Sequence, residues 1–256
     1  MNKRRLGFGI MILSALAVGL PLTVGAAETA ESIIRQVDER QSSSSEVSEI
    51  TMTVIDDLSN PDDRKVFRLE SFSRNSEGDG ELSVYFFREP RRLAGLSILT
   101  RDDGQWVYFP STGRVRLLSG AARSGSVNGV GGDFSYEDLG SGNWAGKYAF
   151  TIQYSTPDVW VLEGRPLSED VNYSKIIMQV HREDYIPRRI DFYKGKSTVE
   201  KYMTVPEVRS YSGRLSPASV EMVNPSKNSK TIIEFHDIQY DKALEDNLFH
   251  PRQFYR

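Results

Sequence analysis

The sequence contains no cysteine and only three histidines. Without cysteine the chain forms no disulfide and no thiolate zinc site, and its N-terminus cannot be lipid-modified through a cysteine. The histidines are His181, His236 and His250, and no His/Asp or His/Glu pair among them has the spacing of metal ligands. We therefore expect no metal and no cofactor.

Motifs that carry catalysis are also missing from the sequence. The glycine-rich stretch after residue 119 lacks the Gly-Lys-Ser/Thr ending of a phosphate loop, and Gly-x-Ser-x-Gly does not occur. The acidic pairs Asp62-Asp63 and Asp102-Asp103 fall at predicted turns, where aspartate is a common turn former. We expect no catalytic residue and no enzymatic activity.

The N-terminus has the pattern of a secretory signal peptide. Lys3, Arg4 and Arg5 precede an apolar run from Leu6 to Leu22, and Val24-Gly25-Ala26-Ala27 offers small residues for cleavage after Ala26 or Ala27. The alternative is a membrane anchor, which the glycines and Pro21 within the run disfavour. We expect residues 1–27 to be a signal peptide and residues 28–256 to be one soluble periplasmic domain.

The mature chain is acidic. The leader holds three of the 32 basic residues and none of the 35 acidic ones, so its removal changes the formal net charge from −3 to −6. This balance argues against nucleic acid or a general anionic membrane surface as the main partner.

The remaining sequence predicts one helix followed by about a dozen short strands. Residues 28–41 are helical in pattern, with Ile33, Ile34 and Val37 on one narrow apolar face. Alternating apolar and polar residues separated by Gly, Pro, Asn and Asp turns then continue to Tyr240. The connections are too short for helical crossovers, so we expect an antiparallel barrel or sandwich.

The stretch from Trp106 to Leu139 departs from this alternating pattern. A predicted hairpin, 106–109 and 114–118, is followed by a loop of small residues up to Gly132 and then by a short acidic and aromatic segment capped by Ser135. Long loops inside compact domains are usually functional or disordered. We interpret this stretch as a lid over the sheet; the alternative is a connection without a role.

Several predicted strands are apolar on both faces, as in 82–87 and 106–109. A sheet with one solvated face alternates more strictly. The second face is therefore covered by the helix, by the loop or by a ligand. The last residues, with Leu248, Phe249 and Phe254 around Pro251, are expected to dock as a plug or a final turn.

Three groups of residues together resemble the outer-membrane lipoprotein-sorting proteins, in their LolA-like branch. The first is Ile33-Ile34-Arg35-Gln36-Val37-Asp38 after a signal peptide. The second comprises Trp106 to Pro110, Arg114-Val115-Arg116 and Asp133-Phe134-Ser135-Tyr136-Glu137-Asp138-Leu139. The third comprises Ile186 to Ile190, Pro217 to Met222 with Asn224, and Thr231-Ile232-Ile233. The resemblance covers essentially the whole mature chain.

This resemblance implies an incomplete, half-open antiparallel β-barrel with an N-terminal helix and a helical or loop lid. It implies a periplasmic carrier that shields the acyl chains of a lipoprotein or lipid in an apolar groove. An inner-membrane exporter of the resistance-nodulation-division type is the implied partner, with transient membrane-protein contacts. The alternative is a lipid- or lipoprotein-sensing module that regulates a membrane partner.

We assign candidate residues to this expected groove by their size and apolarity. Groove-lining candidates are Phe67, Leu69, Val84, Phe86, Leu96, Ile98, Trp106 and Tyr108, and the apolar side of the lid is Phe134, Tyr136 and Leu139. Arg114, Arg116 and Arg123 are candidates for contact with a headgroup or an acidic partner, the alternative being solvated strand-face charges. Replacing Phe134 and Tyr136 by Ala is expected to weaken lipid retention without unfolding the domain.

Overall fold

The computed structural model describes residues 28–256, apart from residues 42, 77–79, 102–103, 140–141 and 196. The predicted signal peptide and its cleavage site lie outside the described residues. The described chain begins with helix α1 (Ala30–Gln41), which confirms the predicted helix apart from its first two residues. Thr29 caps it, since its hydroxyl accepts from the Ser32 amide at 3.2 Å and its amide donates to the Ser32 hydroxyl at 3.0 Å.

Thirteen of the strands form one antiparallel sheet, in the order β6-β5-β4-β3-β2-β1-β15-β14-β13-β12-β11-β10-β9. The strands are β1 (Ser45–Ile55), β2 (Arg64–Ser76), β3 (Gly80–Glu89), β4 (Ser97–Arg101), β5 (Gly104–Phe109), β6 (Arg114–Leu117), β9 (Tyr148–Ser155), β10 (Val159–Pro166), β11 (Lys175–His181), β12 (Pro187–Tyr193), β13 (Lys201–Tyr211), β14 (Arg214–Asn224) and β15 (Ser229–Tyr240). Strands β6 and β9 are its edges. The half-open antiparallel barrel is confirmed.

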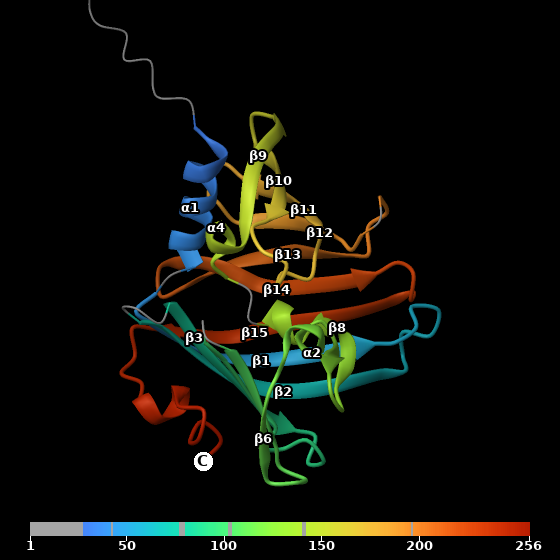
Figure 1. Ribbon diagram of the computed structural model, residues 1–256, viewed down its shortest axis with the longest axis vertical. Helices are drawn as coiled ribbons and strands as arrows, with labels where there is room; N and C mark the ends of the chain where they lie inside the picture. The colour runs from blue at the N-terminus through green and yellow to red at the C-terminus, as the bar shows by residue number, and fades with distance from the viewer. Residues whose placement is uncertain (1–27, 42, 77–79, 102–103, 140–141, 196) are drawn as a thin grey trace, which may run out of the picture.

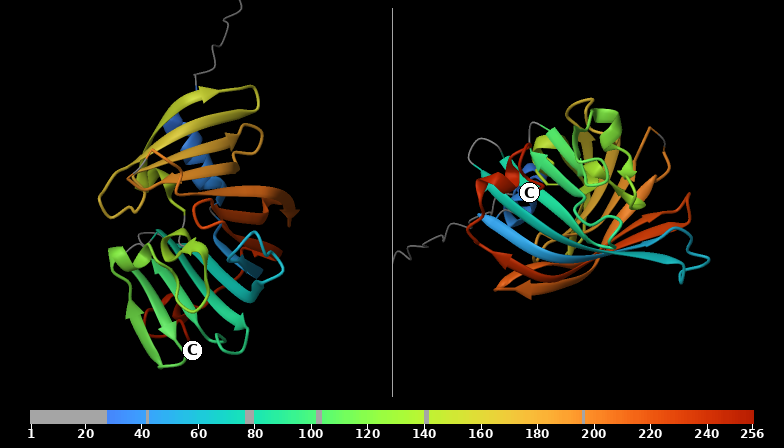
Figure 2. Two further views of the ribbon diagram at one scale, coloured as in Figure 1. Left: turned by 90° about the vertical axis from the view of Figure 1, so that its right-hand side faces the viewer. Right: turned by 90° about the horizontal axis from the view of Figure 1, so that it is seen from below.

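The sheet curves around α1 and the segment that follows β6 (Figures 1 and 2). Twist is intrinsic to paired strands, and register shifts at Glu49/Ile50 in β1 and Arg68/Leu69 in β2 add local bends. We call the face toward α1 the inner face and the opposite face the outer face. Ile33, Ile34 and Val37 of α1 are at most 1% exposed and pack into the core on the inner face.

The segment between β6 and β9 crosses the inner face, and we call residues 119–139 within it the lid. It contains helix α2 (Gly120–Arg123), a small two-stranded sheet of β7 (Ser126–Val127) and β8 (Gly131–Ser135), and helix α3 (Tyr136–Leu139). Helix α4 (Trp144–Lys147) follows. Sequence reasoning expected no strand here, whereas residues 131–135 form β8, which pairs with β7 through Gly131 and Ser135.

A second apolar cluster lies on the outer face of β3 to β5. Leu82, Val84, Phe86 and Leu99 pack there against Phe249 and Phe254 of the C-terminal segment. This segment contains a 3-10 helix, η1 (Asp246–Phe249), and Tyr255 stacks on Tyr108 with ring centroids 4.1 Å apart. The two apolar faces of these strands are thus both covered by protein, and the C-terminal residues dock as expected.

The described helices are all too short or too polar to cross a membrane.

We expect Phe254→Ala to lower the free energy of unfolding by about 3–5 kcal/mol, because Phe254 is 1% exposed and its loss leaves a cavity against β3 and β4. Urea denaturation measures this change. Leu167→Ala is the control, since Leu167 is 58% exposed and its loss should change stability by no more than about 0.5 kcal/mol. Similar small effects for both variants would mean that the C-terminal segment contributes no packing energy.

Candidate functional site

The inner face encloses a cavity of about 650 Å³ between α1, the lid and the sheet. Its volume lies within the range of about 300–1,000 Å³ that is usual for small-molecule sites. The wall formed by β13 to β15 is mainly apolar, with Met203, Val205, Val220, Ile233, Phe235 and Ile238, but it also includes the polar side chains of Arg214, Ser216 and Tyr240. The wall formed by β1 to β5 carries mainly hydroxyl, carboxyl and amide groups at the cavity.

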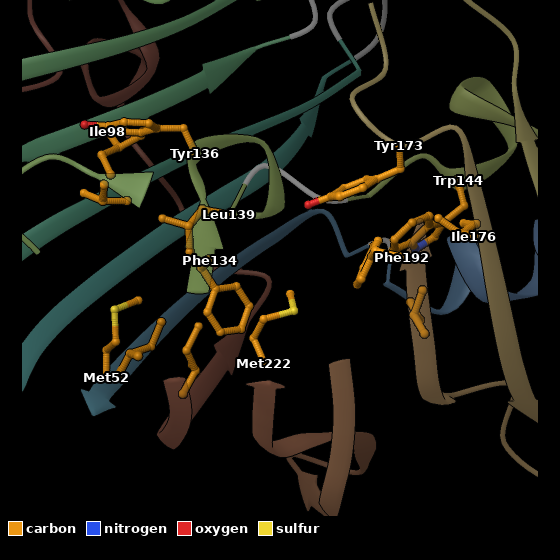
Figure 3. Packing of buried hydrophobic residues seen from close by; sticks show 14 of the residues in the cluster. Met52, Ile98, Phe134, Tyr136, Leu139, Trp144, Tyr173, Ile176, Phe192 and Met222 are labelled. Carbon is orange, nitrogen blue, oxygen red and sulfur yellow. The ribbon is translucent and has the colours of Figure 1, made fainter. Parts of the chain in front are cut away.

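The lid contributes apolar side chains to the cavity. Phe134 and Leu139 line it and are 5% and 6% exposed. Figure 3 shows the Phe134 ring between Met52 of β1 and Met222 of β14. Tyr136 is also buried, but its hydroxyl accepts a hydrogen bond from the Asn128 amide at 2.9 Å, within the lid. The lid therefore has its own internal packing and closes part of the inner face.

A capping box shapes the end of the lid. The Asp138 carboxylate accepts from the Ser135 amide at 2.6 Å, and the Ser135 hydroxyl accepts from the Asp138 amide at 3.2 Å. This reciprocal pair forms the turn from β8 into α3 and confirms Ser135 as the predicted cap. It also holds the Asp138 carboxylate in the protein interior.

A buried ion pair fastens the lid to the sheet. Lys201 of β13 donates from Nζ to Asp138 Oδ2 at 2.5 Å and to the Asp133 carbonyl at 2.8 Å. The Lys201 and Asp138 side chains are 8% and 6% exposed. The Tyr173 hydroxyl donates to the other Asp138 oxygen at 2.8 Å, and burial raises the pKa of Tyr173. Every oxygen of the carboxylate therefore has a donor, as a buried charge requires.

Asp133 fastens the lid to β15. Its carboxylate accepts from the Ser229 hydroxyl at 2.6 Å and from the Thr231 hydroxyl at 3.2 Å, while its amide donates to the Thr231 hydroxyl at 2.9 Å. Burial raises the pKa of Asp133, and the two hydroxyl donors oppose that shift. Close packing accompanies these bonds, since a side chain at Gly132 would lie 2.7 Å from the Thr231 hydroxyl oxygen.

Helix α4 is held against α1 on the other side of the cavity. The Asp38 carboxylate accepts from the Trp144 and Ala145 amides, each at 2.9 Å, at the α4 N-terminus. The Trp144 side chain lines the cavity and is 6% exposed. Its indole Nε1 has no hydrogen-bond partner among the described residues.

The eight predicted groove residues divide between the two faces of the sheet. Phe67, Leu69, Leu96 and Ile98 belong to the inner core, whereas Val84, Phe86, Trp106 and Tyr108 belong to the outer cluster under the C-terminal segment. We expected these eight to include groove-lining positions, but none of them lines the cavity of about 650 Å³. They lie on both faces because side chains alternate across a strand and the sequence did not reveal which face is inner. Any role of the inner four in lipid binding stays a prediction.

The expectation for the Phe134 and Tyr136 double alanine variant also requires correction. Both side chains are at most 5% exposed and belong to the inner core. Truncating a buried aromatic residue costs about 3–5 kcal/mol, so the double variant removes stability along with any contact to a ligand.

The three predicted arginines lie in different surroundings. Arg123 lines the cavity, and its Nε has no partner among the described residues. Arg114 and Arg116 are exposed on the edge strand β6, and the Arg116 guanidinium lies 5.6 Å from the centre of the Phe109 ring. Contact of any of them with a headgroup or partner stays a prediction.

Sequence reasoning missed the apolar wall of the cavity and the ion pair that fastens the lid. The wall residues alternate along β13 to β15 as core residues do, so their pattern does not separate a cavity wall from a filled core. Lys201 and Asp138 are 63 residues apart, and nothing local to either residue predicts the contact. In the part of the chain that the structure describes, no cluster of three or more His, Cys, Asp or Glu could hold a metal ion.

We expect Lys201→Met to destabilise the protein by about 3–5 kcal/mol, because it leaves the Asp138 carboxylate buried without its counter-charge. Urea denaturation at pH 7 tests this. Arg209→Ala is the matched control, since its ion pair with Glu207 is solvent-exposed and should contribute little. A stability of Lys201→Met equal to that of the control would contradict the role of the ion pair as a fastening.

Glu46 makes stability depend on pH. It lines the cavity, accepts from the Ser48 hydroxyl at 2.8 Å, and has a pKa raised mainly by burial. Between its unfolded and folded pKa values the folded state binds more protons, so the free energy of unfolding falls as pH rises through that window. Glu46→Gln should therefore show a flatter decline than wild type in urea titrations between pH 4 and 7. Parallel profiles for the two proteins would contradict this assignment.

Comparisons with known proteins found matches over most of the chain. A family model described as "Uncharacterized protein" matches residues 79–256, which is more than half of the sequence. No curated protein is a significant match.

Solved structures share the fold. A domain assigned as an outer membrane lipoprotein-sorting protein from Vibrio parahaemolyticus is 24% identical, with a TM-score of 0.77 and coverage of 88% of this chain and 98% of that one. A DUF1329 family protein from Desulfovibrio piger is 22% identical, with a TM-score of 0.77 and coverage of 86% and 95%. A LolA superfamily protein from Nitrosomonas europaea is 22% identical, with a TM-score of 0.71 and coverage of 88% and 98%. The chain thus belongs to the family that the matching model describes, and its fold is that of the solved LolA superfamily and outer-membrane lipoprotein-sorting structures.

Proposed function

We propose that this protein is a periplasmic carrier that holds the acyl chains of a lipoprotein or another lipid during transport towards the outer membrane. The observation that carries the proposal is the cavity of about 650 Å³, which has a mainly apolar wall on β13 to β15 and lies beneath a lid in a LolA-type sheet. The proposal assigns no catalytic step to this cavity.

The apolar acyl chains of the proposed cargo require a cavity of this kind. An acyl chain exposed to water is unfavourable by about 0.8 kcal/mol for each CH₂ group, so a carrier must remove most of the chain from solvent. Met203, Val205 and Val220 present contiguous apolar surface for this purpose, and Ile233 and Phe235 extend it onto β15. Phe134 and Leu139 add apolar surface from the lid.

The fastened lid favours a cavity that exists before the cargo arrives. Lys201 and Asp138 hold the lid against β13, and Asp133 holds it against β15. A preformed site loses less conformational entropy on binding than one that must order around its ligand. This arrangement supports reversible uptake and release by a carrier whose walls move little.

A periplasmic carrier receives its cargo from one membrane and delivers it to another. Following the family resemblance, our proposal includes an inner-membrane exporter of the resistance-nodulation-division type as the donor, with transient contacts at each membrane. Lipid transfer from donor to acceptor vesicles distinguishes a carrier from a sensor, because a sensor binds lipid without delivering it.

We expect Val220→Phe to weaken binding of palmitic acid at least about tenfold, because the larger ring fills the cavity without leaving a void. Native mass spectrometry and titration with a fluorescent fatty acid measure this loss. Val223→Phe is the control: Val223 is half-buried three residues along the same strand and does not line the cavity.

Both variants should keep a melting temperature near that of wild type, which separates loss of binding from loss of folding. Equal binding by wild type and Val220→Phe would contradict the assignment of the cavity as the lipid site. A wild-type protein that carries no lipid from the periplasm and binds none when it is added would overturn the proposed function.

A further inference from the structure

Five polar side chains form a row across the inner face of β1 to β5. Each is the register partner of the next on the neighbouring strand, in the order Glu46, Ser73, Ser83, Thr100 and Gln105. All five line the cavity. Neighbouring strands lie about 4.8 Å apart, so the row extends roughly 19 Å across the cavity wall.

The row interrupts an otherwise apolar inner face. Farther along the same strands the inner face carries Phe87, Ile98 and Val107, each with no exposed surface. Ser83 is only 9% exposed and Gln105 only 2%. These polar residues therefore do not form an ordinary solvated sheet face. They line one wall of a cavity whose opposite wall is mainly apolar.

Much of the hydrogen-bonding capacity of the row is unused. Among the described residues, none forms a hydrogen bond with the hydroxyl of Ser73 or Ser83. Gln105 donates from Nε2 to the Thr100 hydroxyl at 3.0 Å and to the Tyr136 carbonyl at 2.7 Å, but its Oε1 has no partner. A hydrocarbon packed against this wall would exclude water from these groups and would provide no hydrogen-bond partner in its place.

We infer that the cavity selects an amphipathic lipid whose polar part carries several hydroxyl groups, as a sugar or polyol does. The hydroxyl groups lie along the row from Ser73 to Thr100, and the hydrocarbon lies against Val220, Ile233 and Phe235. The row itself contains one carboxyl and no cationic side chain; the cations that line the cavity, Arg40, Arg101, Arg123, Lys147 and Arg214, lie outside it. This inference rests on the proposed function, since it names the class of lipid that the same cavity takes.

Dodecyl glucoside and dodecanol provide the test, because they share one chain and differ by the sugar. We expect the wild-type protein to bind dodecyl glucoside at least about tenfold more tightly, with both lipids below their aggregation limits in native mass spectrometry. Ser73→Ala combined with Ser83→Ala and Thr100→Val should bring the affinity for dodecyl glucoside close to that for dodecanol. The affinity for dodecanol should remain unchanged or rise.

Thr151→Val with Ser155→Ala is the control, because both residues are exposed on β9 and neither lines the cavity. Ser83→Ala alone serves if the triple variant is unstable, and it should weaken only the binding of dodecyl glucoside, by about threefold. Equal wild-type affinity for the two lipids overturns this inference and leaves the carrier function standing. Failure of both lipids to bind overturns both proposals.

Discussion

An open sheet has more apolar surface on its inner face than it can bury against itself, and the architecture of this protein follows from that constraint. Helix α1 covers part of the face with Ile33, Ile34 and Val37, and the lid covers another part with Phe134 and Leu139. Covering the face with loop-rich chain brings polar groups into the interior. The ion pair between Lys201 and Asp138 satisfies the most costly of them and ties the lid to the sheet.

The space left between these covers is the cavity. Its two walls differ because the inner face changes character along β1 to β5, from large apolar side chains under the lid to hydroxyl and amide groups beside the cavity. Strands β13 to β15 face the cavity mainly with apolar side chains, apart from Arg214, Ser216 and Tyr240. A ligand with one polar edge and one apolar edge satisfies both walls at once, which connects the carrier function to the row from Glu46 to Gln105.

The outer face of β3 to β5 also carries apolar side chains, and here the C-terminal segment covers them. Val84, Phe86 and Leu99 would be exposed on a bare sheet, and the C-terminal residues Phe249 and Phe254 bury them. Arg74 supports this docking through an ion pair with Asp246 at 2.7 Å and a position 4.8 Å from the centre of the Phe249 ring. The cavity on the inner face therefore remains the large concave space available to a ligand in the described chain.

The sequence by itself determined the helix, the antiparallel strands, the hairpin of residues 104–117 and the cap at Ser135, because these depend on periodicity and on turn residues close in sequence. Only the tertiary structure decided which face of each strand is inner. Phe67 therefore lies in the inner core, whereas Phe86 packs against the C-terminal segment. It also decided that Val220 lines a space and that Lys201 meets Asp138. The alternation of apolar and polar residues along a strand defines its two faces but does not say which part of the protein covers each face. Contacts between residues distant in sequence form only when the sheet curves and the lid packs on it.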